Sequence, residues 1–168
     1  NVEDNGLEDK IEVRLANGLA AFEPTDGISC ITIAGMGGRL IADILAAGLE
    51  KLANVSRLVL QPNNREDELR DWLVDHDFRI VDEAILEENE KFYEILVVEQ
   101  GSQELTAKEL RFGPYLMREQ APAFVQKWSK EVEKLAFALE QVPVENQSAR
   151  ASLEERIAHI KEVLHVSK

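Results

Sequence analysis

The sequence predicts an α/β sheet that is parallel except at one edge, followed by an antiparallel pair of helices. Over residues 1–101, short β-branched runs alternate with helical patterns, whereas residues 102–168 follow helical spacing alone. The charge changes at the same place. The first part holds 9 basic and 22 acidic residues, and the second part holds 10 of each. We therefore predict a domain boundary near Gly101.

The composition narrows the class of protein. A chain of 168 residues has the length of about one domain, and 45% hydrophobic residues exclude wholesale disorder. A net charge of −13 excludes a polycation that binds nucleic acid by bulk attraction. The single cysteine, Cys30, excludes an internal disulfide and a cysteine-based zinc site. Without a secretory signal or an apolar run near the roughly 20 residues of a membrane helix, we expect a cytoplasmic protein.

Five strands and two main helices are expected in the first part. The expected strands are residues 11–15, 28–33, 58–60, 78–86 and 92–100. Asn64 is a good N-cap for the helix after the third strand, because acidic residues follow it in the first turn. The expected buried faces of the two helices are Leu40, Ile41, Ile44 and Leu45, and Leu69, Trp72 and Leu73. The last two strands, joined by the acidic turn 87–90, predict an antiparallel hairpin.

The second part contains two apolar stripes at helical spacing, separated by Pro143. The stripes are Phe124, Trp128, Val132, Leu135, Leu139 and Val142, and then Leu153, Ile157, Ile160 and Leu164. Two such helices joined by a loop over 143–148 are expected to pair antiparallel, like a short coiled coil. Trp128 is therefore expected in the core.

A glycine cluster, Gly35-Met36-Gly37-Gly38, lies between an expected strand and helix, where α/β sheets bind ligands. A dinucleotide fingerprint fails here, because Leu40 occupies the third glycine position and the next strand ends in Gln61 rather than an acid. A P-loop fails as well. A tight strand–helix turn explains the cluster equally well.

Amide side chains follow the next strand, in Gln61-Pro62-Asn63-Asn64. Amides donate and accept, so they suit the edge of a base, although plain helix capping is the alternative. Asn17-Gly18 is either a simple turn or a contact for a ligand. Cys30 is expected in the core, and the three histidines show no metal-ligand spacing.

Basic residues of the second part could contact phosphates even on an acidic protein, or simply pair with neighbouring glutamates on the helix surface. They are Lys108, Arg111, Arg118, Lys127, Lys130 and Lys134.

Three stretches in this order and spacing resemble the bacterial tRNA (adenine-22-N1)-methyltransferases, the TrmK family. They are residues 31–38 (ITIAGMGG), 58–64 (LVLQPNN) and 91–95 (KFYEI). The resemblance covers essentially all 168 residues, including the two-helix tail.

The resemblance implies a class I methyltransferase that uses S-adenosylmethionine, with a Rossmann-like sheet and an added coiled-coil-like helical domain. Its substrate would be N1 of an adenine in the tRNA D-loop, with no metal and no membrane involved. The family's first two strands, which hold part of the cofactor, are not found in the sequence. The Rossmann-like domain of residues 1–101 is therefore expected to be incomplete at its amino end, which fits a chain that opens on Asn1 rather than Met.

The resemblance also implies roles for individual residues. Those implied to bind the cofactor are Asn17, Gly18, Ala34, Gly35, Met36 and Gly37. Those implied to contact the tRNA are Gln61, Pro62, Asn63, Tyr93, Lys127, Lys130 and Lys134. Methylation at N1 leaves a cationic adenine, so an acceptor near N6 would favour the product. The Asn63 side-chain oxygen and a carbonyl near Gly35 are the candidates for this catalytic role.

Three other functions remain open on these residues. One is a non-catalytic Rossmann-like binding module or fragment. Another is a methyltransferase acting on rRNA, a protein or a small molecule. The third, a dinucleotide-dependent oxidoreductase, is disfavoured by the failed fingerprint.

Overall fold

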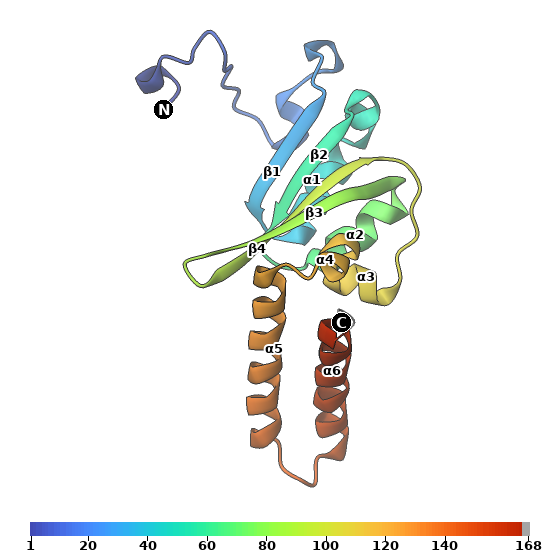
Figure 1. Cartoon of the computed structure of the whole chain (residues 1–168). Helices are drawn as coiled ribbons and strands as arrows, with labels where there is room; N and C mark the ends of the chain where they lie inside the picture. Colours follow the sequence, from blue (N-terminus) through green and yellow to red (C-terminus); the bar gives the residue numbers. More distant parts are fainter. Residues whose placement is uncertain (166–168) are drawn as a thin grey trace.

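Among the residues that the structure describes, one mixed sheet of four strands forms the body of the protein. The computed structural model describes residues 1–165 and places helices α1 and α2 against one face of this sheet (Figure 1). β1 (Cys30–Met36) and β2 (Arg57–Pro62) run parallel. β4 (Lys91–Gln100) is antiparallel to both β2 and β3 (Phe78–Glu88). The spatial order is β1–β2–β4–β3, so the reversed strand β4 lies one place in from the edge. The prediction of an α/β sheet with an antiparallel hairpin at one edge is confirmed.

The helices α1 (Gly38–Ala47) and α2 (Glu66–Asp75) each bury one stripe against the sheet. Four of the residues predicted on these apolar faces have no exposed surface, namely Ile41 and Leu45 of α1 and Leu69 and Leu73 of α2. The two residues of each pair are four positions apart. They form one core with alternate residues of the strands, namely Ile33, Leu58, Leu60, Leu96 and Val98. This core holds together the two strand ends that lead into α1 and α2. Short 3₁₀ turns complete the first part: Glu3–Asn5, Gly18–Ala21, Pro24–Asp26 and Leu49–Asn54.

The hairpin of β3 and β4 turns through Asn89 and Glu90, as the acidic turn predicts. Both residues have positive φ, 50° and 63°, which suits the two-residue turns that match strand twist. Glu87, just before the turn, accepts a hydrogen bond from Gln126 and pairs with Lys130 of the helical part. The hairpin tip is therefore held beside the helices.

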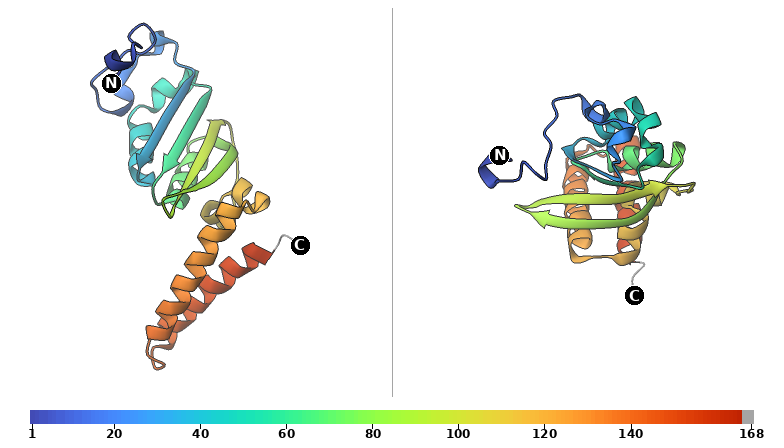
Figure 2. Two further views of the ribbon diagram at one scale, coloured as in Figure 1. Left: turned by 60° about the vertical axis from the view of Figure 1, so that its left-hand side comes forward. Right: turned by 90° about the horizontal axis from the view of Figure 1, so that it is seen from above.

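Within the described residues 102–165, the second part consists of four helices: α3 (Ala107–Phe112), α4 (Pro114–Glu119), α5 (Pro122–Gln141) and α6 (Gln147–His165). The last two lie side by side, antiparallel, and project away from the sheet (Figures 1 and 2). The helices α3, α4, α5 and α6 share one apolar core, made of Phe112, Leu116, Phe124, Trp128, Leu135, Ile160 and Val163. Trp128 is only 7% exposed, so the expectation of a core tryptophan is confirmed.

The strand expected at residues 11–15 does not form. Val13 and Leu15 are 77% and 105% exposed, and no described strand lies beside this segment. A strand exists only when its backbone pairs with a neighbour, however β-like its residues are. The alternating apolar pattern is therefore present without the partner that would turn it into a strand.

Two further expectations were wrong. Cys30 is exposed rather than buried. It lies three residues before the buried Ile33, and this odd spacing places its side chain on the sheet face opposite α1 and α2. Asn64 does not cap α2, since Arg65 takes that position with a φ of 54° and no side-chain bond. Asn64 instead packs against the start of α1.

Within residues 1–165, no helix is both long enough and apolar enough to cross a membrane.

Candidate functional site

The carboxyl ends of β1 and β2 are joined into one rigid edge. The N–H of Asn63 donates to the carbonyl of Met36 at 2.7 Å, and the N–H of Gly38 donates to the carbonyl of Asn64 at 2.9 Å. The glycine cluster and the amide-rich loop are 26 residues apart in sequence, yet each donates a backbone hydrogen bond to the other. The sheet thus brings together the two motifs that the sequence singled out.

The glycines of the cluster serve different purposes. Gly35 is an extra residue in the register of β1, with a φ of +77°, and no atom lies within 4 Å of the place of a Cβ. At Gly37 and Gly38 a Cβ would lie 2.9 Å from the Asn64 Oδ1 and 2.3 Å from the Arg65 carbonyl. Gly35 therefore leaves open space for a ligand against its backbone, whereas the other two allow tight packing onto the next loop.

The side chain of Gln61 connects the two motifs. Its Oε1 accepts a hydrogen bond from the N–H of Gly35 at 2.8 Å. Its Nε2 donates to the Asn63 Oδ1 at 3.1 Å and to the Pro62 carbonyl at 2.9 Å. This fixes the rotation of the exposed Asn63 amide, which retains one oxygen lone pair and both N–H groups for a ligand. Gln61 thus orients Asn63, although Gln61 itself does not line the groove described next.

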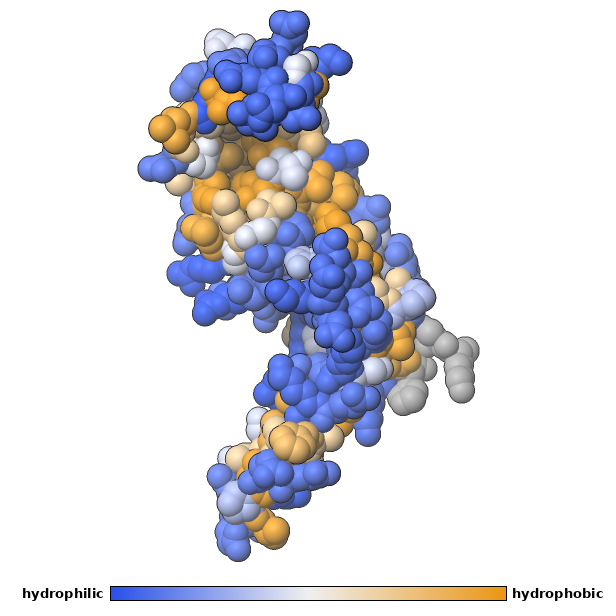
Figure 3. All heavy atoms as spheres, turned by 90° about the vertical axis from the view of Figure 1, so that its left-hand side faces the viewer, coloured by the Kyte–Doolittle hydropathy of each residue, from blue (hydrophilic) through white to orange (hydrophobic). Residues whose placement is uncertain are grey.

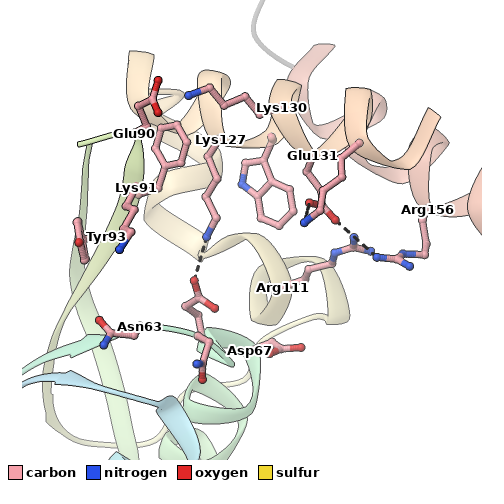
Figure 4. A pocket seen from close by; sticks show the side chains of 15 residues that line it. Asn63, Asp67, Glu90, Lys91, Tyr93, Arg111, Lys127, Lys130, Glu131 and Arg156 are labelled. Carbon is pink, nitrogen blue, oxygen red and sulfur yellow. Dashed lines mark hydrogen bonds and ion pairs between the residues drawn. The ribbon is translucent and has the colours of Figure 1, made fainter. Parts of the chain in front are cut away.

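Asn63 lies at one end of a groove of about 980 Å³ between the sheet and the helical part (Figure 4). Tyr93, on the hairpin, lines the same groove. Ten charged side chains surround it, six basic (Lys91, Arg111, Lys127, Lys130, Lys134, Arg156) and four acidic (Glu66, Asp67, Glu90, Glu131). The groove is therefore net positive in a protein whose net charge is −13. Such a groove suits an anionic ligand.

The three lysines expected to hold the substrate differ in their surroundings. Lys127 is tied down, since its Nζ bonds Glu94 at 2.7 Å and Glu66 at 3.0 Å. Burial lowers the pKa of Lys127, but these two carboxylates outweigh it and hold that pKa above its usual range. Lys130 lies over the Phe92 ring, with its Nζ 5.0 Å from the centroid, and the Lys134 side chain is 80% exposed.

A buried ionic cluster behind the groove was missed by the sequence analysis. The fully buried guanidinium of Arg70 binds Glu83 and Glu94 and donates to the carbonyl of Leu110. Glu83 also accepts the N–H of Tyr115, at the start of α4. Charged residues of the sheet and of α2 thus fasten the helical part. The signal was available, because Glu94 alternates with Leu96 and Val98 on the inner face of β4.

Asn17 and Gly18 lie elsewhere. They line a second cavity, of about 500 Å³, against Leu40 and Ile44 of α1. Residues 34–37 do not line that cavity. The two sets of residues expected to bind a cofactor therefore do not line one common cavity. Within residues 1–165, no group of three or more His, Cys, Asp and Glu side chains is placed to hold a metal ion.

An α/β sheet with an open, glycine-containing carboxyl edge beside a positive groove is the arrangement of a Rossmann-like ligand-binding protein. A family model narrows this class. The model for TrmK, tRNA (adenine(22)-N(1))-methyltransferase, matches residues 1–162, and the chain belongs to that family.

Solved and curated relatives agree. The crystal structure of Streptococcus pneumoniae Sp1610, assigned as a tRNA (m1A22) methyltransferase, is 67% identical with a TM-score of 0.95, over 98% of this chain and 74% of that one. A second Sp1610 structure, in complex with S-adenosyl-L-methionine, is 65% identical with a TM-score of 0.89, over 98% and 73%. The tRNA (adenine(22)-N(1))-methyltransferase of Bacillus subtilis is 37% identical over 97% of this chain and 73% of that protein. The predicted family is confirmed.

Proposed function

We propose that this protein transfers the methyl group of S-adenosylmethionine to N1 of adenine 22 in tRNA. The observation that carries the proposal is the position of Asn63, where the open edge of β1 meets the positive groove. A small cofactor at the edge and a polyanion in the groove would meet at this residue. Such a substrate implies action in the cytoplasm.

The cofactor fits the edge at Gly35, where the exposed backbone has open space beside it. Ala34, Gly35, Met36 and Gly37 would hold it there, with Gly37 also the N-cap of α1. When bound, S-adenosylmethionine supplies an electrophilic methyl group on a sulfonium. Catalysis is then mostly in-line positioning, because adenine N1 is already a nucleophile.

The chain's own contribution to the reaction lies in Asn63 and Tyr93. The target adenine must leave its stack, which costs a few kcal/mol. In this proposal, Tyr93 stacks on the extruded base. The free lone pair of the Asn63 Oδ1 accepts a hydrogen bond from the N6 amino group, which becomes more acidic as N1 gains the methyl group. Both side chains stand at the same end of the groove (Figure 4).

The outer edge of β1 supports the proposal of a Rossmann-like unit that further strands complete. β1 is an end strand of the sheet, and an unpaired edge is a template for another strand. Apolar residues gather beside it, in the hollow seen in Figure 3. Met36 in β1 and Ile28 just before it are each 38% exposed. Strands on this edge would adjoin Gly35 and complete the cofactor site, with residues 102–168 as the helical domain.

Transfer of a labelled methyl group tests the function. We expect transfer to bulk bacterial tRNA, mapped by reverse-transcription stops to position 22, and none to a tRNA with guanine at that position. The assay should use the chain itself and a chimera that adds the part of Sp1610 this chain does not cover. Cofactor binding without transfer by either form would favour the binding module. Transfer to rRNA, a protein or a small molecule alone would favour another substrate.

Reversing the charge of Lys130 and Lys134 is expected to raise the KM for tRNA about tenfold or more, because both line the groove and neither is buried in an ion cluster. The Kd for S-adenosylmethionine should not change. Lys127 is not included in this variant, because it forms ion pairs with Glu94 and Glu66 and its replacement would also affect stability. The matched control is Lys161→Glu, an exposed position of α6 outside the groove. Equal effects of the control and the double variant would contradict a specific groove.

A further inference from the structure

Two arginines meet at the end of the groove away from Asn63. Arg111 comes from α3 and Arg156 from α6, and their guanidinium groups point toward one another (Figure 4). We propose that Arg111 and Arg156 together bind one phosphate of the RNA backbone. The inference rests on the proposed function and names a contact of the same groove.

The charges around this pair are unbalanced. Arg156 shares the carboxylate of Glu131, at 3.7 Å, with Lys134, which lies at 3.6 Å. Within residues 1–165, no carboxylate lies within ion-pairing distance of Arg111. Three cations therefore lie beside one ion-pairing carboxylate, while Asp67 acts on Arg111 from beyond ion-pairing distance, an arrangement that a bound anion would relieve. Burial, and then the charge of Arg156, lower the pKa of Arg111 by more than the carboxylates of Glu131 and Asp67 raise it.

The surroundings prepare Arg111 to bind a ligand. Its guanidinium carbon lies 5.2 Å from the centroid of Phe112 and 5.7 Å from that of Trp128. Stacking on these rings limits the rotamers of the side chain, so less entropy is lost when it binds. A guanidinium offers paired N–H donors that match two oxygens of a phosphate. Two such groups on different helices define a site for a tetrahedral anion.

The position of the pair fits a nucleic acid that already fills the groove. Asn63 and Tyr93 stand at one end and the arginines at the other, with Lys127 between them held by Glu66 (Figure 4). A base at the first end leaves the backbone of a flanking nucleotide to run along the groove. The arginines would fix the register of the strand, while Asn63 contacts the base.

The salt dependence of tRNA binding tests the pair. We expect Arg111→Gln and Arg156→Gln each to weaken tRNA binding about tenfold and to reduce the slope of log K against log salt by about one. Because both contact one phosphate, the double variant should lose no more slope than either single one. Arg111→Lys should restore part of the affinity. The matched control is Arg118→Gln, an arginine that also stacks on an aromatic ring, Tyr115 at 4.8 Å, outside the groove.

A second measurement separates the two proposals. Inorganic phosphate should raise the Tm of the wild type more than that of Arg111→Gln at equal ionic strength. Wild-type methylation with unchanged slopes in both arginine variants would overturn the pair and leave the proposed function intact. If the wild type does not bind tRNA, the proposed function fails, and the phosphate shift alone decides the pair. An equal shift in both proteins then overturns it.

Discussion

Replacing Arg70 with alanine is expected to lower the free energy of unfolding by about 3–5 kcal/mol. The guanidinium has no exposed surface and binds two buried carboxylates, Glu83 and Glu94. Its removal leaves the buried Glu83 without a cation and Glu94 with Lys127 alone, a larger cost than that of the lost contacts themselves. Urea denaturation followed by circular dichroism measures the change.

The control for this prediction is Arg57→Ala. Arg57 also binds a glutamate, Glu99 at 2.7 Å, but its side chain is 54% exposed. Solvent screens an exposed ion pair, so the free energy of unfolding of this variant should be close to that of the wild type. The prediction fails if the two alanine variants are equally stable. A drop at Arg70 would show that the sheet and the helical part are joined by buried charges as well as by apolar packing.

The sheet, the hairpin and the helical pair could be predicted from local patterns, since each pattern is decided by neighbours in the chain. The spacing within one helix is enough to predict the burial of Leu69 and Leu73. The residues of one turn are enough to predict the hairpin at Asn89 and Glu90. Residues 11–15 show the limit of this reasoning. Their alternation is typical of a strand, but strand formation depends on a partner, and local sequence does not reveal whether one is present.

The site was predicted in outline, and its contacts were not. Strand ends pointed to Gly35 and Asn63, because parallel strands bring their carboxyl ends to one edge. No spacing rule relates Gln61 to Gly35, or Lys127 to Glu94, since these bonds depend on how elements pack. Lys127 belonged to a basic cluster in sequence, yet in the structure it neutralises buried carboxylates. Arg111, from the same cluster in sequence, has no ion-pair partner among the residues that the structure describes.

Asn63→Ala is expected to lower kcat for tRNA methylation about 10²-fold, with little change in the Kd for S-adenosylmethionine. The reason is that the Asn63 oxygen is the proposed acceptor for the N6 amino group, whose hydrogen bond strengthens as positive charge develops. Single-turnover kinetics with saturating cofactor isolates this step. Asn63→Asp keeps an acceptor of the same shape and should retain most of the activity. Normal turnover by the alanine variant would contradict the role.

Gln61→Glu is the sharper form of the same test, because it leaves Asn63 in place. A carboxylate can still accept the N–H of Gly35, but it has no N–H for the Asn63 Oδ1 or the Pro62 carbonyl. Two oxygens would then face each other, and the Asn63 amide should rotate to present its NH₂ to the carboxylate. If Asn63 acts through its orientation, kcat falls nearly as far as in Asn63→Ala while the fold keeps its Tm. If kcat is unchanged, the direction of the Asn63 amide does not matter, and the acceptor must be sought in the backbone near Gly35.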